Sequence, residues 1–184
     1  SFSTSFWRMP SSPEEFEVYP NRDSLPFISE YNFDPDWRIN QFVRGTLRLQ
    51  GWAEAWSDVF KEIESLSFPE GDERLQEMSN NFWKENAYEA VEPDRVVLCV
   101  SLKAEKNNKT LYHKTFVLDA WGTNESTAMA RLVSIPVAKA VEIIKTGEIK
   151  PGVSSVPDSS KLVDQWIEMV GSLSQHLEII DHLK

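Results

Sequence analysis

Cysteine and glycine are scarce in this sequence of 184 residues. The single cysteine, Cys99, cannot close a disulfide within the chain, and its place in the apolar run VVLCV predicts a buried thiol in a reducing compartment. The seven glycines never occur as G-x-G. This excludes the dinucleotide-binding fingerprint, and the phosphate-binding P-loop motif is absent as well. We therefore expect this chain to bind no NAD or NADP by itself.

Long apolar runs and basic clusters are also missing. No stretch approaches the ~20 apolar residues of a transmembrane helix, and the N-terminus lacks the basic and apolar regions of a signal peptide. The net charge of -10 and the pI near 4.8 argue against nucleic-acid and anionic-membrane surfaces, because phosphate binding depends on clustered lysine and arginine. The expectation is a soluble, cytoplasmic protein with no nucleic-acid and no membrane partner.

Familiar catalytic and metal-binding motifs are absent as well. There is no H-E-x-x-H, no cysteine cluster and no G-x-S-x-G, and the three histidines, His113, His176 and His182, are scattered over a hairpin and the C-terminus. The carboxylates of the first helices have no paired arrangement and are explained by solvated helix faces. The sequence predicts no metal site and identifies no catalytic residue, general base included.

Periodic patterns are present along the first half of the chain. Alternation predicts strands, and apolar residues at helical spacing predict two helices. Trp52, Trp56, Trp83 and Trp166 fall on apolar helical stripes, which favours core packing over a stacking platform for sugars or bases. The expected elements are strands at Glu15–Tyr19 and Arg38–Gln50, one helix over Trp52–Leu66 and a shorter one over Leu75–Asn86.

The second half begins with an expected antiparallel hairpin, Arg95–Glu105 and Thr110–Trp121, joined by KNNK. A helix capped by Ser126 or Thr127 should end at Gly147, with a kink or break near Ser134 because Pro136 lies inside it. Its expected apolar stripe is Met129, Leu132, Val133, Val137, Ala140, Val141 and Ile144. A last helix from Ser159 or Ser160 and a strand over His176–Leu183 complete an α+β fold, with a mixed, largely antiparallel sheet and helices packed on one face.

Three motifs in order resemble a known family. FEVYPNRDSLPFISEYNF (residues 16–33), VRGTLRLQGW (43–52) and STAMARLVSIPVAKAVEIIKTGEIKPGV (126–153) resemble the substrate-binding and dimerisation C-terminal domain of saccharopine dehydrogenases, also called saccharopine reductases. The sequence has Leu49 where the family has tyrosine, Ser134 where it has glycine, and a shorter helical insertion before the hairpin. The resemblance implies one domain or fragment over residues 1–184, with no counterpart of the family's nucleotide-binding domain.

The resemblance also implies a reaction and partners. It implies NAD- or NADP-dependent hydride transfer at the C–N bond of saccharopine in lysine metabolism, with the cofactor held by the missing nucleotide-binding domain and the isolated chain inactive. It further implies a homodimer and an amino-acid substrate. The alternative is a non-enzymatic amino-acid-binding or oligomerisation domain that retains the fold.

The substrate implied by the resemblance carries three carboxylates, so its site needs cationic anchors. Arginine suits this because its planar guanidinium pairs with a carboxylate through two hydrogen bonds. Arg22 lies in the proline-bounded turn, where Asn21 and Asp23 either orient it or only cap the turn. Arg44, Thr46 and Arg48 are spaced by two residues and share one face of a regular strand. The resemblance implies that Thr46 binds a substrate carboxylate, whereas Arg44 and Arg48 bind either substrate or acidic residues across the sheet.

Overall fold

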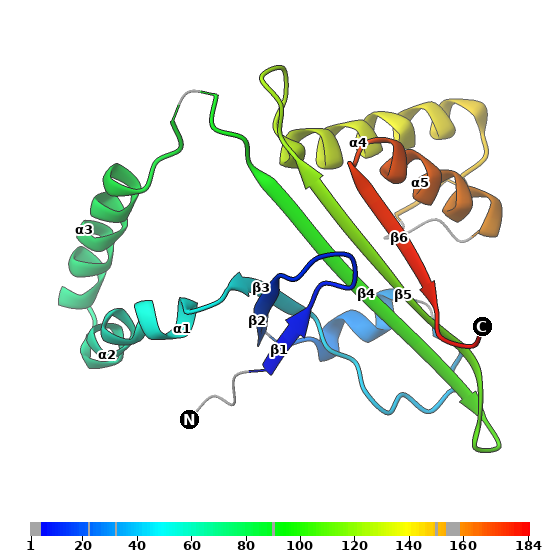
Figure 1. Cartoon of the computed structure of the whole chain (residues 1–184), viewed down its shortest axis with the longest axis horizontal. Helices are drawn as coiled ribbons and strands as arrows, with labels where there is room; N and C mark the ends of the chain where they lie inside the picture. Colours follow the sequence, from blue (N-terminus) through cyan, green and yellow to red (C-terminus); the bar gives the residue numbers. More distant parts are fainter. Residues whose placement is uncertain (1–4, 22, 32, 90, 150, 154–158) are drawn as a thin grey trace. The chain divides into compact units, whose positions relative to one another are not determined.

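The structure is a computed structural model that describes residues 5–21, 23–31, 33–89, 91–149, 151–153 and 159–184. The chain divides into two compact units, Ser1–Ala90 and Val91–Lys184 (Figure 1). Each unit contains its own three-stranded antiparallel sheet. The α+β class is confirmed, and the single sheet expected from the sequence is replaced by two.

The sheet of the first unit has the strand order β1-β2-β3, formed by β1 (Ser5–Arg8), β2 (Glu15–Pro20) and β3 (Gly45–Leu49). The strand expected from Glu15 is confirmed. The strand expected from Arg38 is wrong in length, because β3 begins only at Gly45. Ile39 and Val43 alternate as strand residues do, yet both are exposed, so the alternation has no sheet partner or buried face to support it.

The helices of the first unit are the 3-10 helix η1 (Leu25–Tyr31), α1 (Trp52–Ala55), α2 (Ser57–Ser65) and α3 (Glu70–Glu85). The single helix expected over Trp52–Leu66 is divided at Trp56, which lies between α1 and α2. The shorter helix is confirmed but begins five residues earlier than the expected Leu75. Trp83 is 77% exposed, so the prediction that it packs in the core is wrong.

The second unit is built on the sheet β4-β5-β6, formed by β4 (Arg95–Lys106), β5 (Lys109–Trp121) and β6 (His176–Asp181). The expected hairpin and the closing strand are confirmed. Asn107 and Asn108 at the hairpin tip have φ values of 52° and 59°, the left-handed conformation that a two-residue type I′ turn requires.

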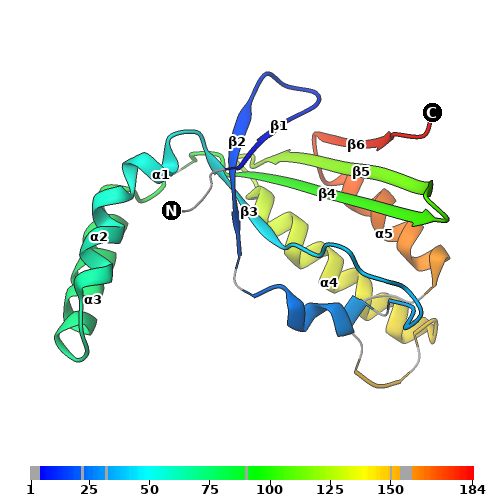
Figure 2. The ribbon, with the colours of Figure 1, turned by 90° about the horizontal axis from the view of Figure 1, so that it is seen from below.

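Two helices, α4 (Ala128–Thr146) and α5 (Ser160–Ser172), lie on one face of this sheet (Figure 2). Leu118, Ala120 and Ala128 form the buried centre between sheet and helices, and Val96, Leu132, Val170 and Leu177 pack against it. Thr127 and Ser159 cap the two helices as expected, and Gly147 ends α4 with a φ of 76°. The break expected near Ser134 is not found, because α4 runs continuously past Pro136.

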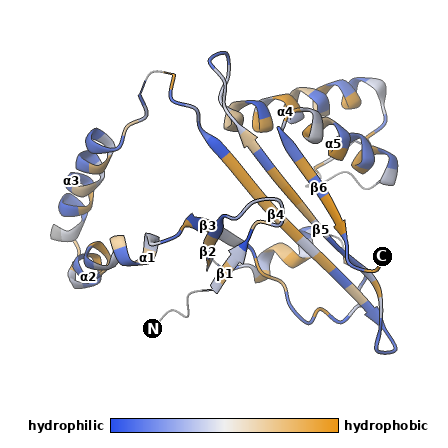
Figure 3. Cartoon of the chain, viewed as in Figure 1, coloured by the Kyte–Doolittle hydropathy of each residue, from blue (hydrophilic) through white to orange (hydrophobic). Residues whose placement is uncertain are grey.

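One side of α4 is apolar but uncovered. Leu132 packs on the core as expected, whereas most of the predicted stripe is exposed: Met129, Val133, Val137, Val141 and Ile144. On β4, Leu98, Val100 and Leu102 are exposed too, and Figure 3 shows β4 hydrophobic over part of its length and hydrophilic at both ends. The described part of the chain contains no helix that is both long and apolar enough to cross a membrane.

Candidate functional site

The polar turn and the arginine-bearing strand are joined by two backbone hydrogen bonds. The Asn21 N–H donates to the Arg44 carbonyl at 2.9 Å. The Arg44 N–H donates to the hydroxyl of Ser24, also at 2.9 Å. Two motifs separated by about twenty residues are therefore held together at the start of β3. Arg22 lies outside the described residues.

Asp23 has a local role. Its Oδ1 accepts a hydrogen bond from the Leu25 N–H at 3.0 Å, at the entrance to η1. This is the turn-capping geometry that short acidic side chains favour. The capping interpretation therefore holds for Asp23, and its role toward Arg22 stays a prediction.

The guanidinium groups of Arg44 and Arg48 lie over aromatic rings. The Arg44 Cζ is 3.7 Å from the centre of the Phe27 ring, and the Arg48 Cζ is 5.3 Å from a Trp52 ring centre. A cation–π contact positions a guanidinium over an aromatic ring. The N–H groups point outward in the plane of the guanidinium and stay able to donate hydrogen bonds. Among the described residues neither arginine forms an ion pair with a carboxylate, so cross-strand pairing is not what positions them.

Thr46 and Arg48 share one face of the first sheet with residues of β2. Tyr19 is opposite Thr46, and Glu17 is opposite Arg48. Residues directly opposite on paired strands project to the same side. Thr46 is half-buried and Arg48 is exposed. The ring centres of Tyr19 and Trp52 are 5.2 Å apart. The expected common face of Thr46 and Arg48 is therefore confirmed, whereas Arg44 stands just before the strand.

Glu17 is the residue at this site that the sequence did not single out. It is 5% exposed, and its carboxylate accepts hydrogen bonds from the Tyr19 hydroxyl at 2.5 Å, the Gly51 N–H at 2.6 Å and the Ala53 N–H at 3.0 Å. The Tyr19 hydrogen bond, followed by the backbone N–H groups, holds the pKa of Glu17 below its usual value against the opposing effect of burial. Glu17 thus caps α1, and no ion pair between it and Arg48 is found among the described residues.

Replacing Glu17 with glutamine should destabilise the protein in a pH-dependent way. Because the pKa of Glu17 is lowered in the folded state, its stabilising effect is complete above the ordinary value of 4.5 and is lost as pH falls through the folded-state pKa. The difference in urea midpoint between wild type and Glu17→Gln should therefore be largest near neutral pH and shrink in acid. A difference that stays constant from pH 7 to pH 3 would contradict this. Glu64→Gln, on the exposed side of α2, is the control and should show no such trend.

The N-terminus of α4 is closed to anions. The carboxylate of Asp94 accepts hydrogen bonds from the N–H groups of Ala128 at 2.7 Å and Met129 at 2.9 Å, and the Thr127 hydroxyl accepts from Ala130 at 3.0 Å. Burial of Asp94 acts to raise its pKa, but these backbone hydrogen bonds and the charge of Arg131 prevail and lower it. The first helical N–H groups are therefore satisfied within the chain, and the capping role expected of Thr127 is confirmed.

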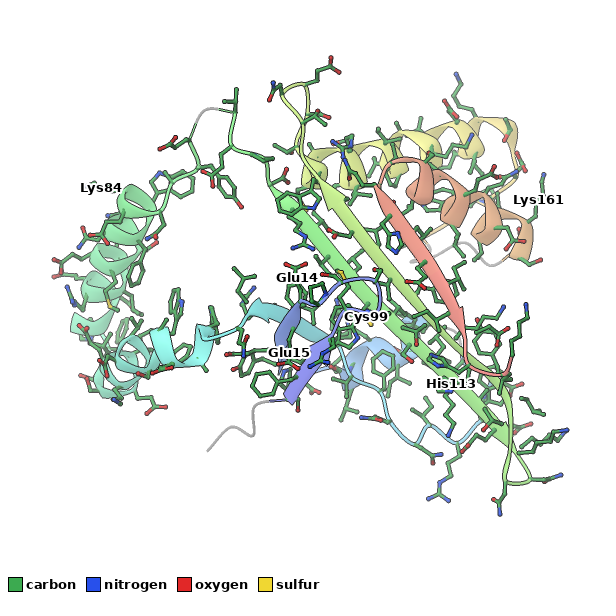
Figure 4. The ribbon with its side chains drawn as sticks, in the orientation of Figure 1. Glu14, Glu15, Lys84, Cys99, His113 and Lys161 are labelled. Carbon is green, nitrogen blue, oxygen red and sulfur yellow. The ribbon has the colours of Figure 1, made fainter. Side chains whose placement is uncertain are left out.

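One face of the second sheet gathers polar side chains. The rings of His113 and His182 stack with centres 4.1 Å apart, and the hydroxyl of Thr115 lies 2.9 Å from the His182 Nε2 and donates to the Ser101 hydroxyl at 3.1 Å. Cys99 and His113 both lie on this hairpin (Figure 4). Burial raises the pKa of the Cys99 thiol, which disfavours the reactive thiolate.

Farther along the same sheet, Arg95 and Asp119 form a two-point ion pair, with Nε–Oδ1 and Nη2–Oδ2 distances of 2.8 and 2.7 Å.

The fold brings together two of the three histidines that are scattered in the sequence, because His113 and His182 are in contact. Within the described ranges, no group of three or more His, Cys, Asp and Glu side chains is arranged to hold a metal ion.

These features define an α+β protein whose candidate site is a small antiparallel sheet carrying arginines on aromatic supports. The chain matches the family model described as the saccharopine dehydrogenase C-terminal domain over residues 2–173, and it belongs to that family. A search of curated proteins found no match.

Proposed function

We propose that this chain is the substrate-binding portion of a saccharopine dehydrogenase-like oxidoreductase. Support comes from its family and from the two hydrogen bonds that join the PNRDS turn to the start of β3. Those bonds bring Asn21 and Arg44 together, and Arg22 follows Asn21 in the sequence. The proposed substrate site consists of Arg22, Arg44, Thr46 and Arg48, with Asn21 and Asp23 supporting the turn.

Charge complementarity is the chemical basis of this proposal. Saccharopine presents three carboxylates, whereas the chain has a net charge of -10, so a binding site must concentrate positive charge locally. Arg44 and Arg48 supply this charge, and Glu17, the acidic residue opposite Arg48, accepts hydrogen bonds from the Tyr19 hydroxyl and backbone N–H groups and, in the part of the chain that the structure describes, makes no ion pair with Arg48. Each guanidinium can then donate two hydrogen bonds to one carboxylate.

The hydride donor is assigned to a separate nucleotide-binding domain. None of the seven glycines forms G-x-G, and the missing dinucleotide-binding fingerprint supports assigning NAD or NADP to another domain. The proposed overall reaction is reversible hydride transfer at the C–N bond of saccharopine, within lysine metabolism. The part of this chain is to bind the carboxylates and fix the substrate's orientation, and the chain alone is expected to be inactive.

We also propose a nucleotide-binding domain and a second copy of the chain as partners, in the cytoplasm. The exposed apolar side chains of α4 and β4 support a partner surface, because exposed apolar patches of this kind commonly mark interaction sites. The same observation favours a second candidate function, a non-enzymatic amino-acid-binding or oligomerisation domain. Dehydrogenase activity of the complete protein would separate the two.

Titration calorimetry of the chain with saccharopine tests the substrate assignment. We expect saturable binding, with amide NMR shifts at Thr46 and Arg48, and no binding of a secondary amine of similar length that lacks carboxylates. NAD and NADP should not bind tightly. No response to saccharopine well above about 1 mM, the upper end of usual KM values, would contradict the substrate assignment. Tight NAD or NADP binding would contradict the cofactor assignment.

A further inference from the structure

The facing sides of α2 and α3 form an apolar groove of about 420 Å³ in the first unit. We call it the α2–α3 groove, and its main lining residues are Trp56, Val59, Ile63, Leu75, Phe82 and Trp83. Met78 is buried at the groove, with 7% of its surface exposed. The groove shares no residue with the proposed substrate site.

Side-chain contacts join the two helices that form the α2–α3 groove. Trp56 and Phe82 bring the two helices into contact with ring centres 5.4 Å apart, and Arg74 bridges them through an ion pair with Glu62 at 2.5 Å. Trp83 stands at the groove but leaves most of its ring in water. A large aromatic side chain this exposed beside an apolar groove is typical of a contact that is completed by a partner.

The helices around the groove are strongly acidic. Between Trp52 and Asn86 the sequence has nine carboxylates and three cationic side chains, which is a net charge of -6 out of the chain's -10. Two of the cations are already paired within the helices, since Lys61 binds Asp58 at 2.7 Å and Arg74 binds Glu77 as well as Glu62. Lys84 is the third and lies on α3 (Figure 4).

The negative charge of these helices distinguishes between two possible occupants of the groove, a second copy of the chain and a cationic partner. A second copy of the groove would bring a segment of charge -6 against another of the same charge, which opposes self-association. A cationic partner has the opposite balance. We propose that the α2–α3 groove binds a basic amphipathic helix of a partner protein.

The dimensions of the groove suit a short helix. The lining residues from Leu75 on α3 to its C-cap Asn86 are eleven intervals apart, or about 16 Å at 1.5 Å per residue, which matches about three helical turns. Apolar residues of the partner at positions i, i+3, i+4 and i+7 would cover Trp83 and Leu75. Asp72 and Glu85 each lie three residues from a lining residue, so they flank the groove where lysine or arginine on the partner would meet them.

The test uses a fluorescein-labelled 14-residue helical peptide of leucine and lysine, with leucine at those four positions, and the complete chain. Fluorescence anisotropy should show binding that weakens as salt is raised, and Trp83→Ala should raise the Kd at least tenfold. Trp37→Ala is the matched control, because Trp37 is 62% exposed and lies outside the groove. It should leave the Kd unchanged. Asp72→Asn combined with Glu85→Gln should raise the Kd severalfold and reduce its dependence on salt.

Four results would overturn the proposal. The first is absence of binding at peptide concentrations up to about 100 μM, which corresponds to a binding free energy weaker than about -5.5 kcal/mol. The second is equal binding of a matched peptide with glutamate in place of lysine, and the third is no effect of Trp83→Ala. The fourth is self-association of the chain in sedimentation that disappears in Trp83→Ala, which would assign the groove to a second copy.

Discussion

Replacing Asp94 with alanine is expected to lower the free energy of unfolding of the second unit by about 2–3 kcal/mol. The substitution leaves the N–H groups of Ala128 and Met129 without their carboxylate acceptor at the start of α4. Ala128 is fully buried, so water cannot easily replace the lost hydrogen bond. Urea unfolding followed by circular dichroism measures the change. Asp94→Asn should lower the free energy of unfolding by less, because asparagine keeps one acceptor oxygen.

Asp164→Ala is the matched control for Asp94. Asp164 is an exposed residue of α5, and no hydrogen bond or ion pair within the described residues involves its carboxylate. Its replacement should change the free energy of unfolding by less than about 0.5 kcal/mol. If Asp94→Ala costs no more than this control, the cap does not contribute as proposed.

The second large effect concerns Arg22 and Arg44 in the proposed complete enzyme. Alanine at either position should lower kcat/KM for saccharopine by about thirtyfold or more, equivalent to about 2 kcal/mol, because the proposed charge-assisted pair with a substrate carboxylate would be lost. Arg44→Lys should recover only part of the loss, since an ammonium cannot reproduce the two parallel hydrogen bonds of a guanidinium. Steady-state kinetics with varied saccharopine measures both parameters.

Arg38→Ala serves as the control in the same assay. Arg38 is exposed and lies six residues before Arg44, outside β3, so removing it changes the net charge equally without touching the proposed site. Unchanged kinetics for Arg38→Ala, together with unchanged unfolding midpoints for the other variants, would attribute the loss to substrate binding. Unchanged kcat/KM in Arg22→Ala and Arg44→Ala alike would remove both arginines from the site.

Elements whose signals are local were predictable from the sequence. The hairpin follows from two alternating runs around two asparagines, and α4 follows from Thr127 and Gly147 at its ends. The capping carboxylates were not predictable in this way. Glu17 reaches Ala53 across 36 residues, and Asp94 reaches Ala128 across 34, so no local spacing indicates either contact.

The sequence also did not predict which apolar side chains of the helices face the core and which are exposed. In α4 the apolar residues occupy more than one side of the helix, so periodicity alone did not identify Leu132 as core-facing and Val133 as exposed. Trp83 follows the helical apolar pattern of α3, yet it is exposed beside a groove. At the candidate site, the turn and the strand are joined by hydrogen bonds of Asn21, Ser24 and Arg44, and the role of these residues in substrate binding stays a prediction.

The capping of helices by distant carboxylates has a consequence for how each unit assembles. Glu17 belongs to β2 and caps α1, and Asp94 directly precedes β4 and caps α4. The N–H groups of Ala53 in α1 and of Ala128 and Met129 in α4 gain these acceptors only when the distant carboxylate has reached its place. Formation of helix and sheet is thereby coupled within each unit, so that each unit should open and close as one cooperative block in native-state exchange.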